Sequence, residues 1–445
     1  MAPPANPPGA AGGAGDSPAA QSPESGPRPR TLPEWLAYIE ARHTKAIDLG
    51  LDRVRAVSQR LGQRPTCPVV TVAGTNGKGS TCAMLESILG AAGYRVGLYT
   101  SPHLQRYNER VRIAGREASD GQLCAGFARV EAARGDVPLT YFEYGTLAAW
   151  EAFAEAGLDA VVLEVGLGGR LDATNLFDAD CAVVTGIDLD HMEYLGNDRE
   201  SIGFEKAGIF RPGRPAVCGD PQPPASLLAH AHGIGAGLRV LGRDFGFVRQ
   251  DGQWQYWGAH GRRSGLAHPA LRGARQLYNA STVLATLDCL RDRLPVAMRD
   301  IRQGLAAVEL PGRFQVLPGR PTVVLDVAHN PQSARTLAEN LGDMAFHPRT
   351  WAVFGMLRDK DMAGVVEALR GRVDRWLPAG LEGPRGAAGD ELAAVLRETG
   401  ESVAGVFADP AQAYRHALEN AGEDDRILAF GSFLTVAHVM QAVAR

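Results

Sequence analysis

The segment at residues 69–81, VVTVAGTNGKGST, combines an apolar, β-branched run, a glycine-rich turn, one lysine and the start of a helix. Such a turn can aim successive backbone N–H groups into one concavity, and the following helix adds a favourable field for an anion. Lys78 would then reach the outer phosphates of a nucleotide. Three glycines would allow close approach of the backbone to a ligand: Gly74, Gly77 and Gly79.

This segment departs from the common phosphate-binding spacing G-x-x-x-x-G-K-[ST], because Val72 stands where the first glycine belongs and Gly79 follows the lysine. The departure weakens a general P-loop assignment, and a plain tight turn before a helix is the alternative. We predict a phosphate-binding loop of unusual spacing, since a strand, a turn and a helix follow one another in the required order.

Oxygen and nitrogen donors follow other apolar runs. Ser101 in YTSPHL and Glu164 in VVLEVGLGGRLDATN offer hard oxygen ligands for Mg²⁺, and His191 in VVTGIDLDH could complete a divalent-ion site that bridges nucleotide phosphates. Taken singly, His191 is also compatible with a structural histidine, and Glu164 with a loop carboxylate. The glycine-rich GLGGRLDATN segment is too long for a hairpin turn and suits a loop that folds against a ligand.

Strand and helix patterns alternate through the first half of the chain, which predicts a mainly parallel α/β sheet covered on both faces. Ligands of such sheets bind beyond the carboxyl ends of the strands, where the predicted donors lie. An amphipathic pattern with breaks at Gly50 and Gly62 predicts helices between residues 32 and 61. The predicted strands are 68–73, 96–100, 160–165, 182–185 and 215–218, and the predicted helices include 80–92 and 144–155.

The pattern changes in the second half. Short alternating pieces with glycine at residues 241–268 predict an antiparallel insertion, and a helix is expected at 276–291. Strand patterns resume after LPGRFQVLPGRP, at 322–327, 351–354, 403–407 and 427–430. We therefore expect a disordered Pro/Ala/Gly-rich tail at residues 1–30, a central domain at 31–317 and a smaller C-terminal α/β domain at 318–445.

Composition narrows the possible functions. The chain has 445 residues, 45% of them hydrophobic, and a formal net charge of −4, which argues against a general polyanion-binding protein. No stretch reaches the roughly 18 apolar residues of a membrane span, and the start of the chain lacks the pattern of a secretory signal, so a soluble, cytoplasmic protein is expected. Six cysteines without a C-x-x-C pair are interpreted as reduced core thiols.

Lysine is rare in this chain. Of its 46 basic residues only four are lysine, and the rest are arginine. A lysine in such a chain can mark a site that needs a compact ammonium, or an amine able to lose its proton, which arginine cannot supply. Chance is the alternative explanation for the four positions, which are Lys45, Lys78, Lys206 and Lys360.

Nine motifs taken together carry a resemblance to a known family. In order they are GTNGKGS, SPHL, TYFEYGT, LEVGLGGRLDATN, DHMEYLG, EKAGIF, LPGRFQ, DVAHNP and GSFLTVAHVM. The chain resembles, from about residue 32 to 440, the bacterial bifunctional dihydrofolate synthase/folylpolyglutamate synthases of the Mur ligase superfamily. GTNGK alone would also suit the Mur ligases of cell-wall synthesis. The resemblance implies an N-terminal P-loop-like ATPase domain with a parallel sheet, joined to a smaller Rossmann-like α/β domain.

The resemblance implies ATP-dependent joining of L-glutamate to 7,8-dihydropteroate and to reduced folates. A carboxylate is a poor acyl donor, so its oxygen would first attack the γ-phosphate of ATP, and the glutamate amine would then attack the acyl phosphate. Mg²⁺ is the expected cofactor, with a monovalent cation such as K⁺ as a possible addition. A monomer that binds neither nucleic acid nor membrane is expected.

The resemblance also assigns roles to single residues. It assigns ATP to Thr75, Asn76, Gly77, Lys78, Asn279, Arg313 and Asp326, and the metal to Ser101, Glu164 and His191. It assigns the pterin substrate to Lys45, Ala46, Ile47, Asp48, Thr140, Tyr141, Phe142, Glu143, Leu171, Asp172 and Ala173. Phe142 could pack against the flat pterin ring or belong to the core. His329 could act near the phosphates and the incoming glutamate, or cap a helix.

Lys206 is assigned a modification by the same resemblance, which implies a carbamylated lysine that helps to organise the metal site. Only an amine that can be neutral reacts with CO₂, so arginine would not serve. An ordinary ion pair with a nearby carboxylate is the alternative. Lys78, Lys206 and His329 are the predicted catalytic residues, whereas Lys360 has no assigned role.

Two other functions stay open at this point. The first is a Mur-type amino-acid ligase that acts on a nucleotide-linked muramyl substrate, against which the ordered folate-type motifs count. The second is a nucleotide-binding regulatory protein that switches without ligation. A predicted metal site and a complete second domain make this second alternative less favoured.

Overall fold

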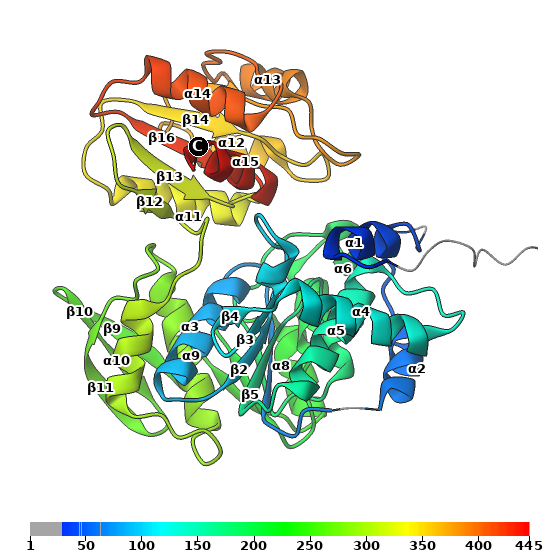
Figure 1. The fold of residues 1–445 in the computed structure, drawn as a ribbon. Helices are drawn as coiled ribbons and strands as arrows, with labels where there is room; N and C mark the ends of the chain where they lie inside the picture. Colours follow the sequence, from blue (N-terminus) through cyan, green and yellow to red (C-terminus); the bar gives the residue numbers. More distant parts are fainter. Residues whose placement is uncertain (1–28, 44, 46, 63, 445) are drawn as a thin grey trace, which may run out of the picture.

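The computed structural model describes residues 29–43, 45, 47–62 and 64–444. Nearly all of the predicted tail at 1–30 therefore lies outside the described residues. Two open α/β sheets make up most of the structure, and Figure 1 shows the second sheet with its helices above the first. Among the described residues, no helix is both long and apolar enough to cross a bilayer.

The first sheet has eight strands in the order β4-β3-β2-β5-β1-β6-β7-β8. β1 lies between β5 and β6 and pairs with both in parallel, while β3 and β4 run antiparallel at one edge. The strands are β1 (Val69–Ala73), β2 (Val96–Tyr99), β3 (Val111–Ile113), β4 (Arg116–Glu117), β5 (Ala160–Glu164), β6 (Cys181–Val184), β7 (Pro215–Cys218) and β8 (Gly237–Val240). The five strands predicted for this half are confirmed, each within two residues.

Alternate side chains of the central strands reach opposite faces of this sheet. Val70 and Val72 of β1 pack with α3, α9 and α10, whereas Val161 and Leu163 of β5 pack with α4 and α5 on the other face. The helices of this half are α1 (Leu32–Glu40), α2 (Asp52–Leu61), α3 (Lys78–Ala91), α4 (Asp120–Arg134), α5 (Tyr141–Glu155), α6 (Met192–Leu195), α7 (Arg199–Ala207), α8 (Ala225–Gly233), α9 (Gln276–Cys289) and α10 (Met298–Ala307), with short 3₁₀ helices at Tyr107–Arg110 and Ala173–Leu176.

The predicted antiparallel insertion forms a three-stranded sheet of β9 (Gly246–Gln250), β10 (Gln253–Gly258) and β11 (Gly261–Ala267). Trp254 and Tyr256 of β10 are fully buried in the core that β1, α3 and α9 share. The insertion is therefore an integral part of this half and packs against α9.

The second sheet has the order β12-β13-β16-β14-β15, parallel except for the antiparallel β12. Helices α11, α12 and α13 cover one face, and α14 and α15 cover the other. The strands are β12 (Gln315–Leu317), β13 (Thr322–Asp326), β14 (Thr350–Phe354), β15 (Arg375–Pro378) and β16 (Arg426–Phe430), and the helices are α11 (Pro331–Gly342), α12 (Met362–Ala368), α13 (Gly389–Glu398), α14 (Pro410–Asn420) and α15 (Phe433–Val443).

One predicted strand of this half is wrong. Residues 403–407 form only two isolated bridges, from Val403 to Trp376 and from Phe407 to Ala379. Val403 and Phe407 are four residues apart, whereas their partners Trp376 and Ala379 are three residues apart. One extra residue in the 403–407 segment therefore interrupts the pairing. Two strands of this sheet were not predicted, β12 and β15. In β15 only two residues, Trp376 and Leu377, are apolar between Arg375 and Pro378.

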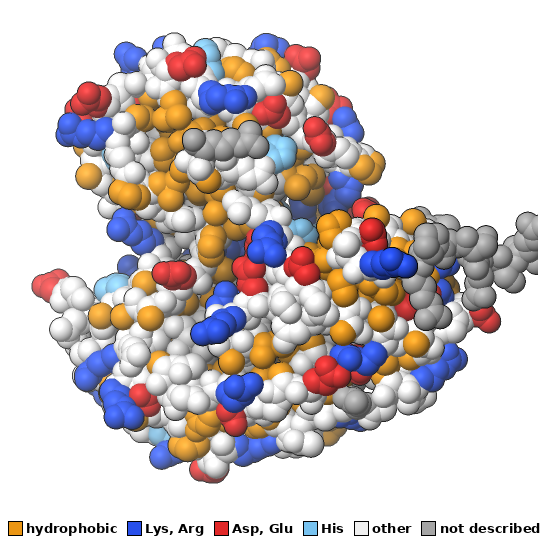
Figure 2. All heavy atoms as spheres, in the orientation of Figure 1, with side chains coloured by type: hydrophobic (Ala, Val, Ile, Leu, Met, Phe, Trp, Pro, Cys, Tyr) orange, Lys and Arg blue, Asp and Glu red, His pale blue; other side chains and the backbone are white. Residues whose placement is uncertain are grey.

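The predicted domain boundary at residue 317 stays a prediction. β12, which ends at Leu317, pairs with β13 and so already belongs to the second sheet. We therefore expect a boundary in front of Gln315 rather than behind Leu317. The surface is hollowed between the two parts of the molecule (Figure 2).

Candidate active site

The loop between β1 and α3 has the shape predicted for phosphate binding, and two of its glycines are required by the fold. Gly74 has φ +148°, and a Cβ there would lie 1.8 Å from Oγ1 of Thr185. Gly77 has φ +90°, and a Cβ would lie 2.6 Å from Oδ1 of Asn279. Gly79 has room for a Cβ, whose nearest neighbour would be 3.6 Å away.

Positive charge gathers at this loop. The Nζ of Lys78 donates hydrogen bonds to the carbonyl oxygens of Gly74, at 3.0 Å, and Thr75, at 3.2 Å. Burial lowers the pKa of Lys78, and the carboxylates of Glu164 and Asp190 only partly oppose this shift. No side chain among the described residues caps the N-terminus of α3, so its first N–H groups are free to bind an anion.

The loop after β6 holds the phosphate loop from the side. Thr185 donates from Oγ1 to the carbonyl oxygen of Asn76 at 2.7 Å, and Thr75 donates from Oγ1 to the carbonyl oxygen of Asp188 at 3.0 Å. The backbone N–H of Thr75 donates to the carbonyl oxygen of Gly186 at 2.7 Å. These bonds fix the conformation of the phosphate loop before any ligand binds.

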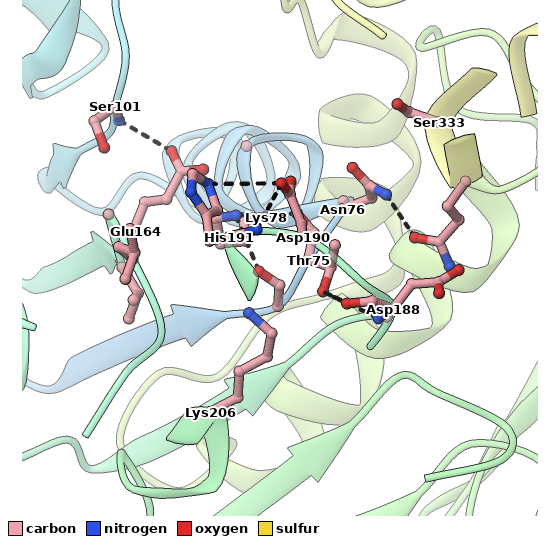
Figure 3. A pocket seen from close by; sticks show the side chains of 18 of the residues that line it. Thr75, Asn76, Lys78, Ser101, Glu164, Asp188, Asp190, His191, Lys206 and Ser333 are labelled. Atoms are coloured by element: carbon pink, nitrogen blue, oxygen red, sulfur yellow. Dashed lines mark hydrogen bonds and ion pairs between the residues drawn. The ribbon is translucent and has the colours of Figure 1, made fainter. Parts of the chain in front are cut away.

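The three predicted metal ligands line one cavity, and Figure 3 shows the Glu164 and His191 side chains pointing towards one another. Glu164, at the end of β5, is 4% exposed, and burial raises its pKa although Lys78 and Arg313 oppose the shift. The backbone N–H of Ser101 donates to its Oε2 at 3.2 Å. Burial also lowers the pKa of His191 to about 4, so its imidazole is neutral and able to bind a metal.

These donors do not form a complete metal centre by themselves. The described residues hold no group of three or more His, Cys, Asp or Glu side chains placed to bind an ion. One carboxylate, one imidazole and one hydroxyl leave several positions of an octahedral Mg²⁺ open, which is the usual arrangement where nucleotide phosphates and waters supply the remaining ligands. The donor set therefore fits a metal that arrives with a nucleotide.

Lys206 points towards the centre of the cavity, as Figure 3 shows. The residue is 3% exposed, and burial lowers its pKa to about 7, with the nearby charge of Lys78 adding to the shift. Its Nζ has no ion pair or hydrogen bond with any residue that the structure describes. An ordinary ion pair therefore has no partner in the part of the chain that the structure describes, although the charge of Asp190 opposes the shift in pKa.

The junction between the two sheets adds three further predicted residues. Asn279 of α9 donates to Gln276 at 3.0 Å, and Arg313 lies with its guanidinium 5.1 Å from the ring centre of Phe433. Asp326, at the end of β13, accepts backbone hydrogen bonds from Phe314 at 2.8 Å and Ala328 at 2.7 Å. Burial raises the pKa of Asp326 and lowers that of Arg313.

His329 lies beside this junction with its Nδ1 2.8 Å from the carbonyl oxygen of Val327. The side chain that caps α11 belongs to the next residue, Asn330, whose Oδ1 accepts from the backbone of Ser333 at 2.9 Å. The alternative role of His329 as a helix cap is therefore not needed, and its Nε2 faces the cavity side near Asp190 at 3.8 Å.

The other end of the cavity is built from ion pairs and caps. Arg53 of α2 contacts Asp48, with Nη1 to Oδ2 at 2.7 Å, and Glu143, with Nη2 to Oε1 at 3.1 Å. Thr140 caps α5 by accepting from the backbone of Glu143 at 3.2 Å. Asp172 is buried and accepts hydrogen bonds from three backbone N–H groups, those of Gly166, Leu167 and Thr174.

Phe142 lies between the core and the cavity. Its ring centre is 5.9 Å from that of Tyr99, and a Cβ on Gly166 would come within 2.6 Å of its ring. The residue is only partly buried and lines the cavity. Phe142 thus packs against Tyr99 and also lines the cavity, and its contact with a pterin ring stays a prediction.

One cavity of about 770 Å³ brings these residues together from both parts of the chain. Every predicted site residue lines it except two. Lys45 is exposed and lines a neighbouring cavity of about 670 Å³, and Ala46 lies outside the described residues. We call Thr75–Lys78, Glu164, Lys206 and Arg313 the phosphate end, and Asp48, Thr140–Glu143 and Leu171–Ala173 the acceptor end.

Sequence reasoning missed Asp190 and Arg53. Asp190 Oδ1 is 2.7 Å from the Nζ of Lys360, and its Oδ2 accepts from Asn330 at 3.1 Å. Burial would raise the pKa of Asp190, but His329, His191 and Lys360 together lower it below its usual value. The available signal was the DLDH sequence, in which Asp190 stands directly before the predicted ligand His191. Arg53 had no signal beyond its place on an amphipathic helix.

The fold and the cavity define a two-part ATP-dependent ligase of the Mur type. The Mur ligase middle domain matches residues 72–218, and the Mur ligase glutamate ligase domain matches residues 312–433. The dihydrofolate synthase/folylpolyglutamate synthase of Escherichia coli K12 is 50% identical over 413 residues, covering 93% of this chain and 95% of the relative. The chain belongs to the dihydrofolate synthase/folylpolyglutamate synthase family.

Solved structures agree with this assignment. Escherichia coli FolC in complex with DHPP and ADP superposes with a TM-score of 0.88 at 49% identity, covering 93% of this chain and 98% of that chain. A bifunctional folylpolyglutamate synthase/dihydrofolate synthase with Mn, AMPPNP and L-glutamate bound has a TM-score of 0.86 at 48% identity, covering 94% and 98%. The expected two-part α/β fold is thus confirmed, with a large sheet and a smaller C-terminal sheet.

Proposed function

We propose that this protein is an ATP-dependent ligase that joins L-glutamate to dihydropteroate, giving dihydrofolate, and to reduced folates, giving folylpolyglutamates. The observation that carries the proposal is the single cavity in which a phosphate loop faces an acceptor wall, in a chain that matches the family over 93% of its length. The relatives' bound ligands, namely ADP with DHPP and AMPPNP with L-glutamate, support the same reading. They favour it over a Mur-type muramyl substrate.

The chemistry proceeds in two transfers. An oxygen of the acceptor carboxylate attacks the γ-phosphorus of ATP, the bond to the bridging oxygen breaks, and ADP leaves. The glutamate amine then attacks the acyl carbon, inorganic phosphate leaves with the bonding electrons, and the amine loses a proton. Lys78 and the first N–H groups of α3 stabilise negative charge on the transferred phosphoryl group, and Arg313 lines the same space.

A divalent ion that arrives with the nucleotide would be held by Ser101, Glu164 and His191, and it would supply charge neutralisation on the phosphates. Thr75, Asn76, Asn279 and Asp326 are proposed to bind other parts of ATP. His329 is proposed to act beside the incoming amine, because it lies at the junction with its Nε2 turned to the cavity.

Lys206 is proposed to carry a carbamate. A buried amine whose pKa is lowered to about 7 is substantially neutral at physiological pH, and only the neutral amine attacks CO₂. The product is an anion in a region where the nearby positive charge of Lys78 also contributes to the lowered pKa of Lys206. A carbamate there would therefore gain the charge partner that the free amine lacks.

The acceptor is proposed to lie against Phe142, with Thr140–Glu143 and Leu171–Ala173 on either side and the 45–48 segment at the rim. Ala46 belongs to this set by resemblance only. The predictions of a monomer, of a cytoplasmic location, of no nucleic-acid or membrane partner and of an added K⁺ requirement stay predictions. Gel filtration with light scattering would test the first.

Mass spectrometry of the products tests the proposal. The enzyme is incubated with ATP, Mg²⁺ and L-glutamate, together with either dihydropteroate or tetrahydrofolate, and each acceptor is expected to gain the mass of one glutamyl residue or more. Reactions without ATP or with Lys78→Met are the matched controls. A mass gain on only one of the two acceptors would reduce the proposal to a single activity. No mass gain on either acceptor would overturn it, whether or not a muramyl nucleotide gains mass as the alternative acceptor.

A further inference from the structure

Lys360 is the one lysine of the chain that the sequence left without a role. It lies in the segment that follows β14 in the second part, 170 residues after Asp190 of the first part. We propose that Lys360 is a positioning residue that holds the second part closed over the phosphate end, and thereby keeps water from the acyl phosphate. This inference rests on the proposed ligase function.

The contact between Lys360 and Asp190 is a nearly buried ion pair. Its Nζ to Oδ1 distance is 2.7 Å, and the two side chains are 8% and 10% exposed. A buried charge is tolerated in a protein only when a partner compensates it. Because the partners sit on different parts of the molecule, the ion pair exists only while the two parts stay together.

Asp190 is also the point at which other bonds between the two parts meet. Its Oδ2 accepts from Nδ2 of Asn330 at 3.1 Å and lies 3.8 Å from Nε2 of His329. Asn330 in turn lies 3.3 Å from the amide of Asn76 in the phosphate loop. The N-terminal turn of α11 is thus bonded both to the phosphate loop and to the loop that carries His191.

Charge explains why a cation is needed at this point. Without Lys360, Asp190 would place a less well compensated carboxylate in the same cavity as Glu164 and a bound triphosphate, and like charges in a buried site repel one another. Separation of the two parts would let water hydrate Asp190 and so relieve the repulsion. Lys360 compensates the charge of Asp190 in the closed arrangement, so that opening no longer lowers the electrostatic repulsion.

Opening during turnover has a chemical consequence. Water would reach the acyl phosphate, its oxygen would add to the acyl carbon, and the bond from that carbon to the phosphate oxygen would break. The acid and inorganic phosphate would be released, so that one ATP is consumed and no amide is formed. The measurable quantity is the number of phosphates released per amide bond made.

The test is Lys360→Met in the full-length protein, with phosphate release and amide product measured in the same reaction. The wild type should release about one phosphate per amide, and the variant on the order of ten, because the intermediate is lost to water. Lys360→Arg keeps the charge and should return the ratio most of the way to one. Arg335→Met is the matched control, because Arg335 pairs with Asp188 of the first part at 3.4 Å but is 58% exposed, and its ratio should stay near that of the wild type.

Asp190→Asn completes the test. If the pair acts as one unit, the Asp190→Asn/Lys360→Met double variant should have a ratio no higher than that of Lys360→Met, and additive effects of the two changes would overturn the proposal. An unchanged ratio with a raised KM for glutamate would instead make Lys360 a substrate-binding residue. Loss of phosphate release in both Lys360 variants would place it in phosphoryl transfer, and would also overturn the proposal. Failure of the proposed function itself is distinguishable, because the wild type would then form no amide.

Discussion

At the acceptor end of the cavity charged side chains bind one another, whereas at the phosphate end they have few partners. Arg53 connects Asp48 to Glu143, and Asp172 accepts from three backbone N–H groups. In contrast, Lys206 has no described partner, and Lys78 donates only to carbonyl oxygens of its own loop. The charged groups at the acceptor end are therefore already paired within the protein. Those at the phosphate end can pair with a bound ligand.

Burial shifts the pKa values of several groups at the phosphate end, whereas at the acceptor end it raises that of Asp172 against the hydrogen bonds that this carboxylate accepts. Burial moves the pKa values of Lys78, Lys206 and Arg313 down and that of Glu164 up, so each group is biased towards its neutral form. A nucleotide with its divalent ion would bring both signs of charge to these groups. Ligand binding should therefore change this end electrostatically, and the acceptor end mainly by packing.

The largest effect on the difference between the two ends is expected from Lys78→Met. The change removes the cation that faces the phosphoryl group, and we expect kcat/KM for ATP to fall on the order of a thousandfold, as for loss of one preorganised charge-stabilising donor. Phosphate release reports the loss, and fluorescence titration with dihydropteroate should show acceptor binding within about twofold of the wild type. A variant that retains ordinary activity would contradict the role of this end.

Lys206→Arg separates a carbamate from a plain cation. Arginine keeps the positive charge but cannot form a carbamate, so we expect it to be as inactive as Lys206→Ala, each on the order of a hundredfold below the wild type. A small carboxylate such as acetate should partly restore Lys206→Ala and leave Lys206→Arg unchanged. Intact-protein mass spectrometry checks the identity of each variant and circular dichroism checks its fold. An active arginine variant would rule out the carbamate.

Part of this site could be predicted from sequence because its signals are local. A β-branched run, a glycine turn and one lysine follow one another within residues 69–81, and burial plus hydrogen bonding then fix their geometry. Glu164 and His191 follow apolar runs whose parallel pairing carries both to one edge of the sheet. The ends of parallel strands meet whatever the loops do, so this much of the site follows from strand pattern alone.

The rest depends on how distant segments dock. The pair of Lys360 and Asp190 joins residues 170 positions apart, and no spacing in either segment encodes it. Arg53 likewise reaches Glu143 from 90 positions away. The same limit explains residues 403–407, whose apolar run suits a strand although one extra residue breaks their pairing with β15. Local sequence patterns indicate which residues are buried. Which distant residues pair with one another depends on the folded structure.

The pH dependence of CO₂ uptake sharpens the account of the phosphate end. Lys206 has a pKa lowered to about 7, so it is mostly protonated and unreactive at pH 6 and mostly neutral at pH 8. After CO₂ is removed, the rate of reactivation at fixed dissolved CO₂ should therefore rise about tenfold between these pH values and level off above. A lysine with an ordinary pKa would still be gaining rate steeply at pH 8 and beyond. Such a profile would show that burial does not tune this amine.

The smallest effect is expected at the acceptor end, from Arg53→Met. Arg53 forms ion pairs with Asp48 and with Glu143 in the first turn of α5. Its loss should make the acceptor end more mobile and leave the binding of the phosphates unchanged. We expect KM for dihydropteroate to rise roughly fivefold, equivalent to about 1 kcal/mol, with KM for ATP unchanged. Arg55→Met is the control, because Arg55 is on the same helix but pairs with the fully exposed Asp52. If KM for dihydropteroate and KM for ATP both rose, the two ends of the cavity would be structurally coupled. That result would contradict the difference between them.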